Sequence, residues 1–219
     1  MDPRGKDVYE GNARLTTDAT RRNTAVRLLT DWGFVRRLVR FALGLPVPVE
    51  TEDRRVLEQV VFPYLAAQPT IKRILFVGCS WYTKHYERAF FRAREFWTMD
   101  IDPAARKFAG KHHIVAGLEQ LADHFPKNHF DLLICNGVYG FGLDSREQCE
   151  SAFAECYARL VPDGYFLFGW TDVTARTPVP LESIESLRQF RRYPLEIFGG
   201  SWRLVTDTPY RHTYEMYRK

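Results

Sequence analysis

The stretch RILFVGCSWYTKHYERAFFRAREFWTMDIDP, residues 73–103, constrains the fold of this 219-residue chain most strongly. Two short apolar runs, ILFV and FWTM, end at Gly78 and at Asp100. The residues between them predict a strand, a turn over 79–83, a helix over 84–93 and a second strand. An acid at the tip of the second strand, about 20 residues after the first turn, is what a nucleotide-binding βαβ unit needs to hold ribose hydroxyls.

The residues beyond this stretch continue to alternate between helix-like and strand-like segments. At this length the pattern indicates one α/β domain with an N-terminal extension. We expect Gly164 to take the positive φ of a tight turn with Asp163, because glycine tolerates that conformation. The expected elements are a helix over 103–109, a strand over 113–116, a helix or turn over 118–124, a strand over 130–135, a helix over 145–160, a strand from the Asp163–Gly164 turn to Phe168, a helix over 181–190, a turn at Gly199–Gly200 and strands over 202–206 and 213–217.

The first 70 residues have a different character. Residues 20–43 read as a helix whose apolar face carries Leu28, Trp32, Val35 and Val39. A second helix is expected over 52–65, capped by Thr51, with Pro63 ending or kinking it, and an extended linker over 45–48 precedes it. Between residues 21 and 40 there are six arginines and one aspartate. This excess could form a patch for an anionic partner or a membrane surface, but we favour the interpretation that it is a solvated helix face.

Charge and cysteine usage exclude some classes of protein. The net charge of +4 is small for a strong nucleic-acid binder. The four cysteines show no C-x-x-C spacing, so we expect reduced thiols in a cytosolic protein. The chain has no apolar leader at its N-terminus and no apolar run of ~18 residues, so we expect neither a signal peptide nor a membrane span. The histidines lack the spacing of a metal site, so no metal is expected.

Several passages of the chain resemble class I S-adenosylmethionine (SAM) dependent methyltransferases. Gly78 matches the first glycine of the family's strand 1 motif, and Asp100 matches its ribose acid. The passage FDLLICN at 130–136 is similar to the family's fourth strand, and LVPDG at 160–164 is similar to its L-K-P-G-G passage. The motif departs from the family where Phe76 replaces the first acid and where Ser80 and Tyr82 replace the second and third glycines.

The resemblance implies a Rossmann-like α/β fold. It implies a seven-stranded sheet, mostly parallel with the last strand antiparallel, preceded by N-terminal helices. Residues 71–219 would form the SAM-binding methyltransferase-like domain, and residues 1–70 a helical extension or lid. We expect the helix over 20–43 to dock over the carboxyl ends of the strands near Asn136, Tyr139 and Trp170, because its apolar face needs cover. A contact in a homodimer or with a membrane surface is the alternative.

The resemblance also carries over site residues. As lining of the SAM site it implies Gly78, Cys79, Ser80, Tyr82, Asp100, Ile101, Leu118, Asn136 and Gly137. The candidates for a general base are His85, Tyr139 and His212, because a hydroxyl or amine acceptor must lose a proton. Trp81 and Tyr82 are too bulky for a bare glycine turn, so we expect them to point into the cleft or onto the N-terminal helices.

Methyl transfer from SAM to a small-molecule acceptor is the function that these features imply. An alternative is a SAM-fold binding or scaffold protein without transferase activity, which the missing glycines favour. A third is an RNA-directed methyltransferase that uses the arginine-rich helix. The chain reads Asn136-Gly137-Val138-Tyr139 where enzymes that methylate exocyclic amino groups in DNA carry Asn/Asp-Pro-Pro-Tyr/Phe, which argues against such an amino target.

Overall fold

The computed structural model describes residues 36, 38–40, 42, 43, 45, 49 and 51–219. The chain divides into two compact units, residues 1–43 and 44–219. In the first unit, residues 36, 38–40 and 42 are helical. Most of the helix expected over 20–43, with Leu28, Trp32 and Val35, lies outside the described residues, as do residues 46–48 of the expected linker.

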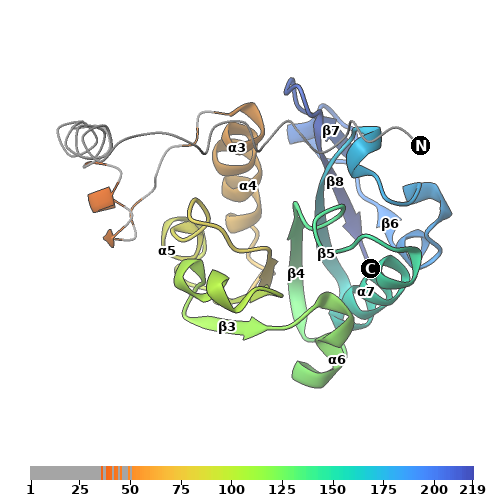
Figure 1. Ribbon diagram of the computed structural model, residues 1–219, viewed down its shortest axis with the longest axis horizontal. Coiled ribbons are helices and arrows are strands. Elements are labelled where there is room, and N and C mark those ends of the chain that lie inside the picture. Colours follow the sequence, from red (N-terminus) through yellow and green to blue (C-terminus); the bar gives the residue numbers. More distant parts are fainter. Residues whose placement is uncertain (1–35, 37, 41, 44, 46–48, 50) are drawn as a thin grey trace, which may run out of the picture. The chain divides into compact units, whose positions relative to one another are not determined.

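The second unit is organised around a mixed sheet (Figure 1). Its strands are β1 Arg73–Val77, β2 Glu95–Asp100, β3 His112–Val115, β4 Phe130–Asn136, β5 Leu160–Thr171, β6 Arg191–Arg192, β7 Arg203–Val205 and β8 His212–Arg218. The strand order is β3-β2-β1-β4-β5-β8-β6, with β7 paired to β8. Strands β1 to β5 run parallel, whereas β8 is antiparallel to β5, β6 and β7. The predicted sheet is confirmed, and the short strand β6, which was not predicted, adds an eighth strand.

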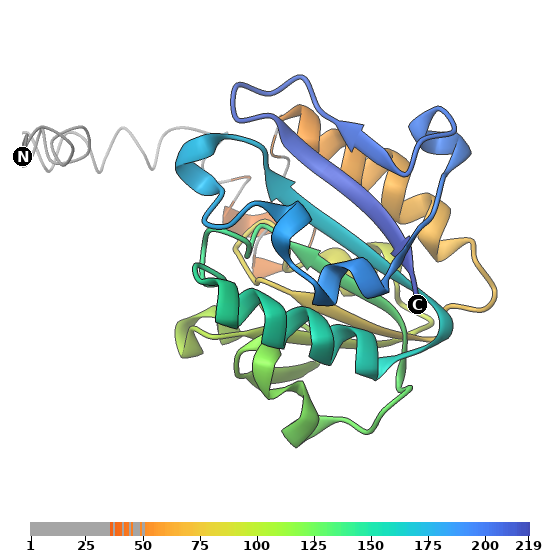
Figure 2. The ribbon, with the colours of Figure 1, turned by 90° about the vertical axis from the view of Figure 1, so that its right-hand side faces the viewer.

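Helices cover both faces of this sheet. The α-helices are α3 Glu52–Val56, α4 Phe62–Ala66, α5 Tyr86–Phe90, α6 Leu121–His124 and α7 Arg146–Arg159. A π segment, η1 Leu57–Val61, joins α3 to α4. The 3₁₀ helices are η2 Pro103–Phe108, η3 Leu118–Gln120, η4 Thr174–Arg176, η5 Leu181–Ser183, η6 Ser186–Gln189 and η7 Glu196–Phe198. Figure 2 shows α7 on one face of the sheet and the continuous helix of residues 52–66 on the other.

Alternation along the strands builds two cores. On β4, Leu133 and Cys135 face α7, whereas Leu132 and Ile134 face the helix of residues 52–66. Successive strand residues point to opposite faces, so the unbroken apolar run LLIC at 132–135 serves both layers. Phe76, at the position of the family's first acid, is part of the second core and packs edge-on against Tyr86.

Pro63 lies inside the helix of residues 52–66 without ending it. Proline lacks an N–H and its ring clashes with the carbonyl four residues earlier. The π segment immediately before Pro63 widens the helix at this point, and the Phe62 N–H bonds to the Leu57 carbonyl, five residues back. The wider turn gives the proline ring room, so the expectation that the helix ends at Pro63 is wrong.

The helix predicted over 181–190 is also wrong. The segment forms the short 3₁₀ helices η5 and η6, separated by Ile184 in an extended conformation. The carboxylate of Glu150 on α7 accepts the Glu185 N–H at 2.7 Å and the Ser186 N–H at 2.8 Å. A carboxylate thus takes the donors that a continuous helix would pair internally, and a tertiary contact overrides the local pattern.

The turn before the apolar part of β5 differs in detail from expectation. Asp163, not Gly164, has the positive φ, at 60°. Gly164 is needed for close approach, because a Cβ there would lie 2.9 Å from the Val161 carbonyl oxygen. A non-glycine residue thus takes the left-handed conformation, and the glycine leaves space for the backbone.

Candidate functional site

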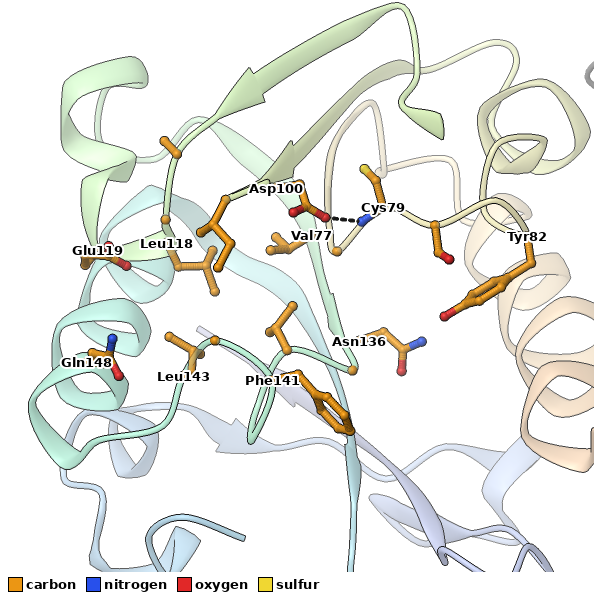
Figure 3. Close-up of a pocket in the computed structure, with 18 residues that line it drawn as sticks. Val77, Cys79, Tyr82, Asp100, Leu118, Glu119, Asn136, Phe141, Leu143 and Gln148 are labelled. Atoms are coloured by element: carbon orange, nitrogen blue, oxygen red, sulfur yellow. Dashed lines mark hydrogen bonds between the residues drawn. The ribbon is translucent and has the colours of Figure 1, made fainter. Parts of the chain in front are cut away.

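A cavity of about 370 Å³ lies at the carboxyl ends of β1, β2 and β4 (Figure 3). The chain runs outward through β1, β2 and β3 and returns to the other side of β1 as β4. The loops after β1 and β4 therefore diverge, which opens a crevice where open α/β sheets bind ligands. The volume is within the range of small-molecule sites.

All nine residues expected to line the SAM site line this cavity: Gly78, Cys79, Ser80, Tyr82, Asp100, Ile101, Leu118, Asn136 and Gly137. The other lining residues are Val77, Ala116, Gly117, Glu119, Val138, Phe141, Gly142, Leu143 and Gln148. Four of these nine, Val138, Phe141, Gly142 and Leu143, belong to the loop after β4, and its glycines at 137, 140 and 142, all with positive φ, are the signal that could have marked it.

Asp100 joins the tips of β2 and β1. Its Oδ2 accepts the Cys79 N–H at 2.6 Å, and its Oδ1 accepts the Asp102 N–H at 2.9 Å. These bonds fix the carboxylate at the cavity wall and leave it lone pairs for a ligand, since a carboxylate has about four acceptor positions. Burial and the neighbouring Asp100 raise the pKa of the Cys79 thiol to about 12, so this thiol is protonated at neutral pH and is not a nucleophile.

The turn after β1 needs only one of the family's three glycines. Gly78 has φ +90°, and a Cβ there would lie 3.2 Å from Val138 Cγ1 and 3.3 Å from the Asn136 carbonyl oxygen. Ser80 and Tyr82 do not have positive φ. The Thr83 hydroxyl closes the turn by accepting the Ser80 N–H at 3.0 Å and donating to the Ser80 carbonyl at 2.9 Å. The loop therefore accommodates side chains at 80 and 82 without strain.

Tyr82 forms one wall of the cavity. The Arg54 guanidinium of α3 lies 4.1 Å from the centre of the Tyr82 ring, and the ring's hydroxyl faces Asn136 across the cavity (Figure 3). The expectation that Tyr82 reaches the cleft and an N-terminal helix is confirmed. Trp81 is 44% exposed and does not line the cavity.

None of the three candidate bases lines the cavity. His85 is buried with Nε2 3.8 Å from a Glu58 carboxylate oxygen. The Tyr139 hydroxyl is buried and bonds to the Val179 backbone, and burial raises its pKa to about 12. His212 is buried behind Asn136, with its Nε2 2.9 Å from Asn136 Oδ1. Only His212 reaches the site, and it does so through another residue.

The lining of the cavity suits a nucleoside. Val77, Ile101, Leu118, Val138 and Leu143 supply apolar surface for a planar base, and Asp100 supplies an acceptor for ribose hydroxyls. Gly137 has φ +74° and open space where a Cβ would stand, which leaves room beside Asn136. Among the described residues no cluster of three or more His, Cys, Asp or Glu side chains suits a metal ion. No helix in the described part of the chain has the length and apolar character to cross a bilayer.

Comparison with known proteins agrees with this architecture. Residues 75–168 match the model of a methyltransferase domain family. The structure of the N-methyltransferase NodS from Bradyrhizobium japonicum WM9 aligns with a TM-score of 0.57 at 16% identity, covering 77% of this chain and 96% of that one. A TehB-like SAM-dependent methyltransferase from Corynebacterium glutamicum aligns with a TM-score of 0.54 at 18% identity, covering 93% of this chain and all of the other.

NodS has also been solved in complex with S-adenosyl-L-homocysteine (SAH), and that structure aligns with a TM-score of 0.54 at 15% identity, covering 88% of this chain and 90% of that one. At these identities the structural likeness shows the fold. No match was found among curated proteins.

Proposed function

We propose that this chain, which carries a class I SAM-dependent methyltransferase domain, transfers the methyl group of SAM to a small-molecule acceptor bound beside Asn136. The observation that carries the proposal is the cavity at the switch point of the sheet, with Asp100 fixed at its wall by two backbone N–H groups. The fold alone leaves the site unspecified, whereas this placement puts the ribose acceptor, the apolar slot and the glycine turn around one space.

Different residues of the cavity bind different parts of the cofactor. Asp100 accepts the ribose hydroxyls, Ile101 and Leu118 enclose the adenine, and the turn from Gly78 to Ser80 receives the amino-acid end. When bound, SAM supplies an already activated methyl group on a sulfonium centre. The protein therefore has to orient the acceptor and exclude water, and needs no metal for this chemistry.

A small-molecule acceptor is supported by what surrounds the cavity. Tyr82, Asn136 and Phe141 border the space beyond the glycine turn, and the Arg176 guanidinium lies 4.5 Å from the centre of the Phe141 ring. The RNA-directed alternative depends on the arginine-rich segment 21–40, which is largely outside the described residues.

A binding or scaffold protein without transferase activity is the second candidate, because Ser80 and Tyr82 replace family glycines. The absence of strain at both positions favours a working cradle over a blocked one. A cytosolic location is part of the same proposal and rests on four unpaired cysteines, of which three are buried.

Calorimetric titration with SAH tests the proposal. We expect wild-type protein to bind SAH, and Asp100→Ala to weaken binding about 10- to 100-fold, because hydrogen bonds to a charged group are each worth ~1.5–3 kcal/mol. Asp102→Ala is the matched control: Asp102 is also an acid of this loop and caps η2 through the Ala104 N–H, but it does not line the cavity.

Circular dichroism of both variants checks the fold. Equal SAH affinity for Asp100→Ala and Asp102→Ala, with both proteins folded, would remove the ribose assignment. Failure of folded wild-type protein to bind either SAM or SAH would favour the scaffold alternative.

A further inference from the structure

We propose that Asn136 presents only hydrogen-bond donors to the methyl-acceptor side of the cavity, and that His212 is the positioning residue that fixes this orientation. It follows that the acceptor atom is an anionic oxygen or sulfur, as in a phenolate, a carboxylate or a thiolate, and not an amine or a ring nitrogen. This inference rests on the proposed function, because it assigns an acceptor class to the same site.

The hydrogen bond between His212 and Asn136 can run in only one direction. The Nε2 of His212 lies 2.9 Å from Oδ1 of Asn136, and both side chains are buried. A carboxamide oxygen can only accept a hydrogen bond. The Nε2 atom must therefore carry the proton and donate it, which leaves the Asn136 NH2 group to point elsewhere.

Gly169 makes this bond geometrically possible. Asn136 on β4 pairs in register with Gly169 on β5, and His212 on β8 pairs with Thr171, two residues further along β5. A Cβ at Gly169 would overlap Asn136 Oδ1 and would lie 2.9 Å from Asn136 Cγ and 3.1 Å from His212 Nε2. The carboxamide oxygen thus lies over the bare backbone of β5, where any side chain at 169 would displace it.

The NH2 group of Asn136 faces the cavity as a consequence. Figure 3 shows its nitrogen directed toward the side of the cavity where the Tyr82 hydroxyl lies. Asn136 lines the cavity, and in the described part of the chain its NH2 makes no hydrogen bond. An unpartnered donor of a largely buried side chain is suited to a ligand acceptor, since burying it unpaired is costly.

The imidazole of His212 is itself held in place. The backbone of His212 is fixed on both sides: its N–H donates to Thr208 Oγ1 at 3.0 Å, and its carbonyl accepts the Thr206 backbone N–H at 2.8 Å. Its ring packs edge-on against Tyr214, with ring centres 4.8 Å apart. Burial lowers the pKa of His212 to about 4; of the charges on α3, Asp53 raises this pKa and Arg54 lowers it, each by less than burial does. At neutral pH the residue is an uncharged donor and is not poised as a base.

The acceptor class follows from counting lone pairs. An oxyanion or thiolate uses one lone pair to form the new bond to the methyl carbon, while the carbon–sulfur bond breaks and its electron pair remains on sulfur. A second lone pair of the acceptor accepts the Asn136 N–H throughout. Such an acceptor arrives deprotonated, so no base has to move a proton. An amine or ring nitrogen has one lone pair, which an Asn136 donor would take from the methyl carbon.

Nuclear magnetic resonance of protein labelled with ¹⁵N-histidine tests the orientation without any acceptor. His212 is assigned among the six histidines by the signal that His212→Gln removes. We expect the neutral Nε2–H tautomer at pH 7. The neutral Nδ1–H tautomer, which leaves Nε2 without a proton to donate, would overturn the proposal.

A binding ratio tests what Asn136 presents to the cavity. Sinefungin is an SAH analogue in which a carbon bearing an ammonium group replaces the sulfur, so it carries donors where a ligand acceptor is expected. We expect wild-type protein to bind sinefungin no more tightly than SAH. Asn136→Asp should shift the ratio of the two Kd values toward sinefungin by about tenfold or more, because a charged acceptor then meets the ammonium.

The positioning role of His212 is tested with the same ratio. His212→Phe removes the donor to the Asn136 oxygen, and Gly169→Ala displaces that oxygen, so each should shift the ratio of Kd values toward sinefungin. His212→Gln keeps a donor and should leave the ratio at the wild-type value. Gly164→Ala is the control, because it also crowds β5, at 2.9 Å from the Val161 carbonyl oxygen, but at the other end of the strand.

The outcomes separate the two proposals. A wild-type preference for sinefungin of about tenfold, or a ratio that His212→Phe leaves unchanged in folded protein, would refute the inference while SAH binding stands. If wild-type protein binds neither compound, the proposed function fails. The tautomer of His212 then still tests whether Asn136 Oδ1 accepts a hydrogen bond from His212 Nε2.

Discussion

Replacing His212 with glutamine should make folding less sensitive to acid. Burial holds the pKa of His212 at about 4 in the folded protein, against 6.5 for an unperturbed histidine. Between these two values the unfolded chain binds more protons than the native protein does. Protonation therefore stabilises the unfolded state, and stability is lost as the pH falls from about 6.5 toward 4.

The size of the effect follows from the two pKa values. At pH 5 protonation of His212 in the unfolded chain lowers the free energy of unfolding by about 2 kcal/mol, and at pH 7 by only ~0.2 kcal/mol. Glutamine keeps an N–H donor for Asn136 Oδ1 but does not titrate. The stability of wild-type protein relative to His212→Gln should thus fall by about 2 kcal/mol between pH 7 and pH 5.

Urea unfolding of both proteins at pH 7, 6 and 5 measures this double difference, because other titrating groups contribute equally to both. Tyr139→Phe is the control: it removes a buried hydroxyl whose pKa is about 12, so it should lower stability equally at every pH. A difference between wild type and His212→Gln that is the same at pH 7 and pH 5 would show that His212 is not buried as a neutral donor.

Three further outcomes are expected. Asp131→Ala removes the acceptor of two backbone N–H groups at the start of β1, at 2.8 and 2.7 Å, and should lower the free energy of unfolding by about 1–3 kcal/mol in urea titrations; an unaltered midpoint would contradict this. Cys79 should react slowly with iodoacetamide at pH 7.5, because its pKa is about 12, and fast labelling there would show a thiolate. Deleting residues 1–43 should leave SAH affinity within a few-fold while abolishing turnover, once an acceptor is identified; normal turnover would exclude the lid.

Local patterns were sufficient to predict the elements that build the site. The apolar run of β4 and the acid at the tip of β2 each depend on a few neighbouring residues, so they are visible in sequence. The same holds for the glycine at 78, whose positive φ a βα turn requires. The nine residues expected to line the SAM site came from the resemblance to the methyltransferase family, and they meet because loops at the carboxyl ends of adjacent parallel strands share one edge.

Contacts between distant parts of the chain could not be predicted in this way. Asn136 and His212 are 76 residues apart, and they meet only because β8 inserts antiparallel beside β5 with Gly169 between them. The sequence therefore offered His212 as a base, without the buried environment that makes it a donor. The failed helix over 181–190 has the same origin, because Glu150 lies on a separate element.

The π turn ahead of Pro63 has a consequence for how this site can evolve. One additional residue in a helical turn rotates everything before it by about 100° around the axis. Here that rotation sets which way Asp53 and Arg54 point: Asp53 Oδ1 accepts the Tyr210 hydroxyl at 2.8 Å, and Arg54 donates to the Tyr86 hydroxyl at 3.1 Å. A single-codon deletion within residues 57–61 would regularise the helix and rotate Asp53 and Arg54 away from Tyr210 and Tyr86. The contacts of Asp53 and Arg54 with these two tyrosines thus depend on the number of residues in the π turn as well as on the side chains themselves.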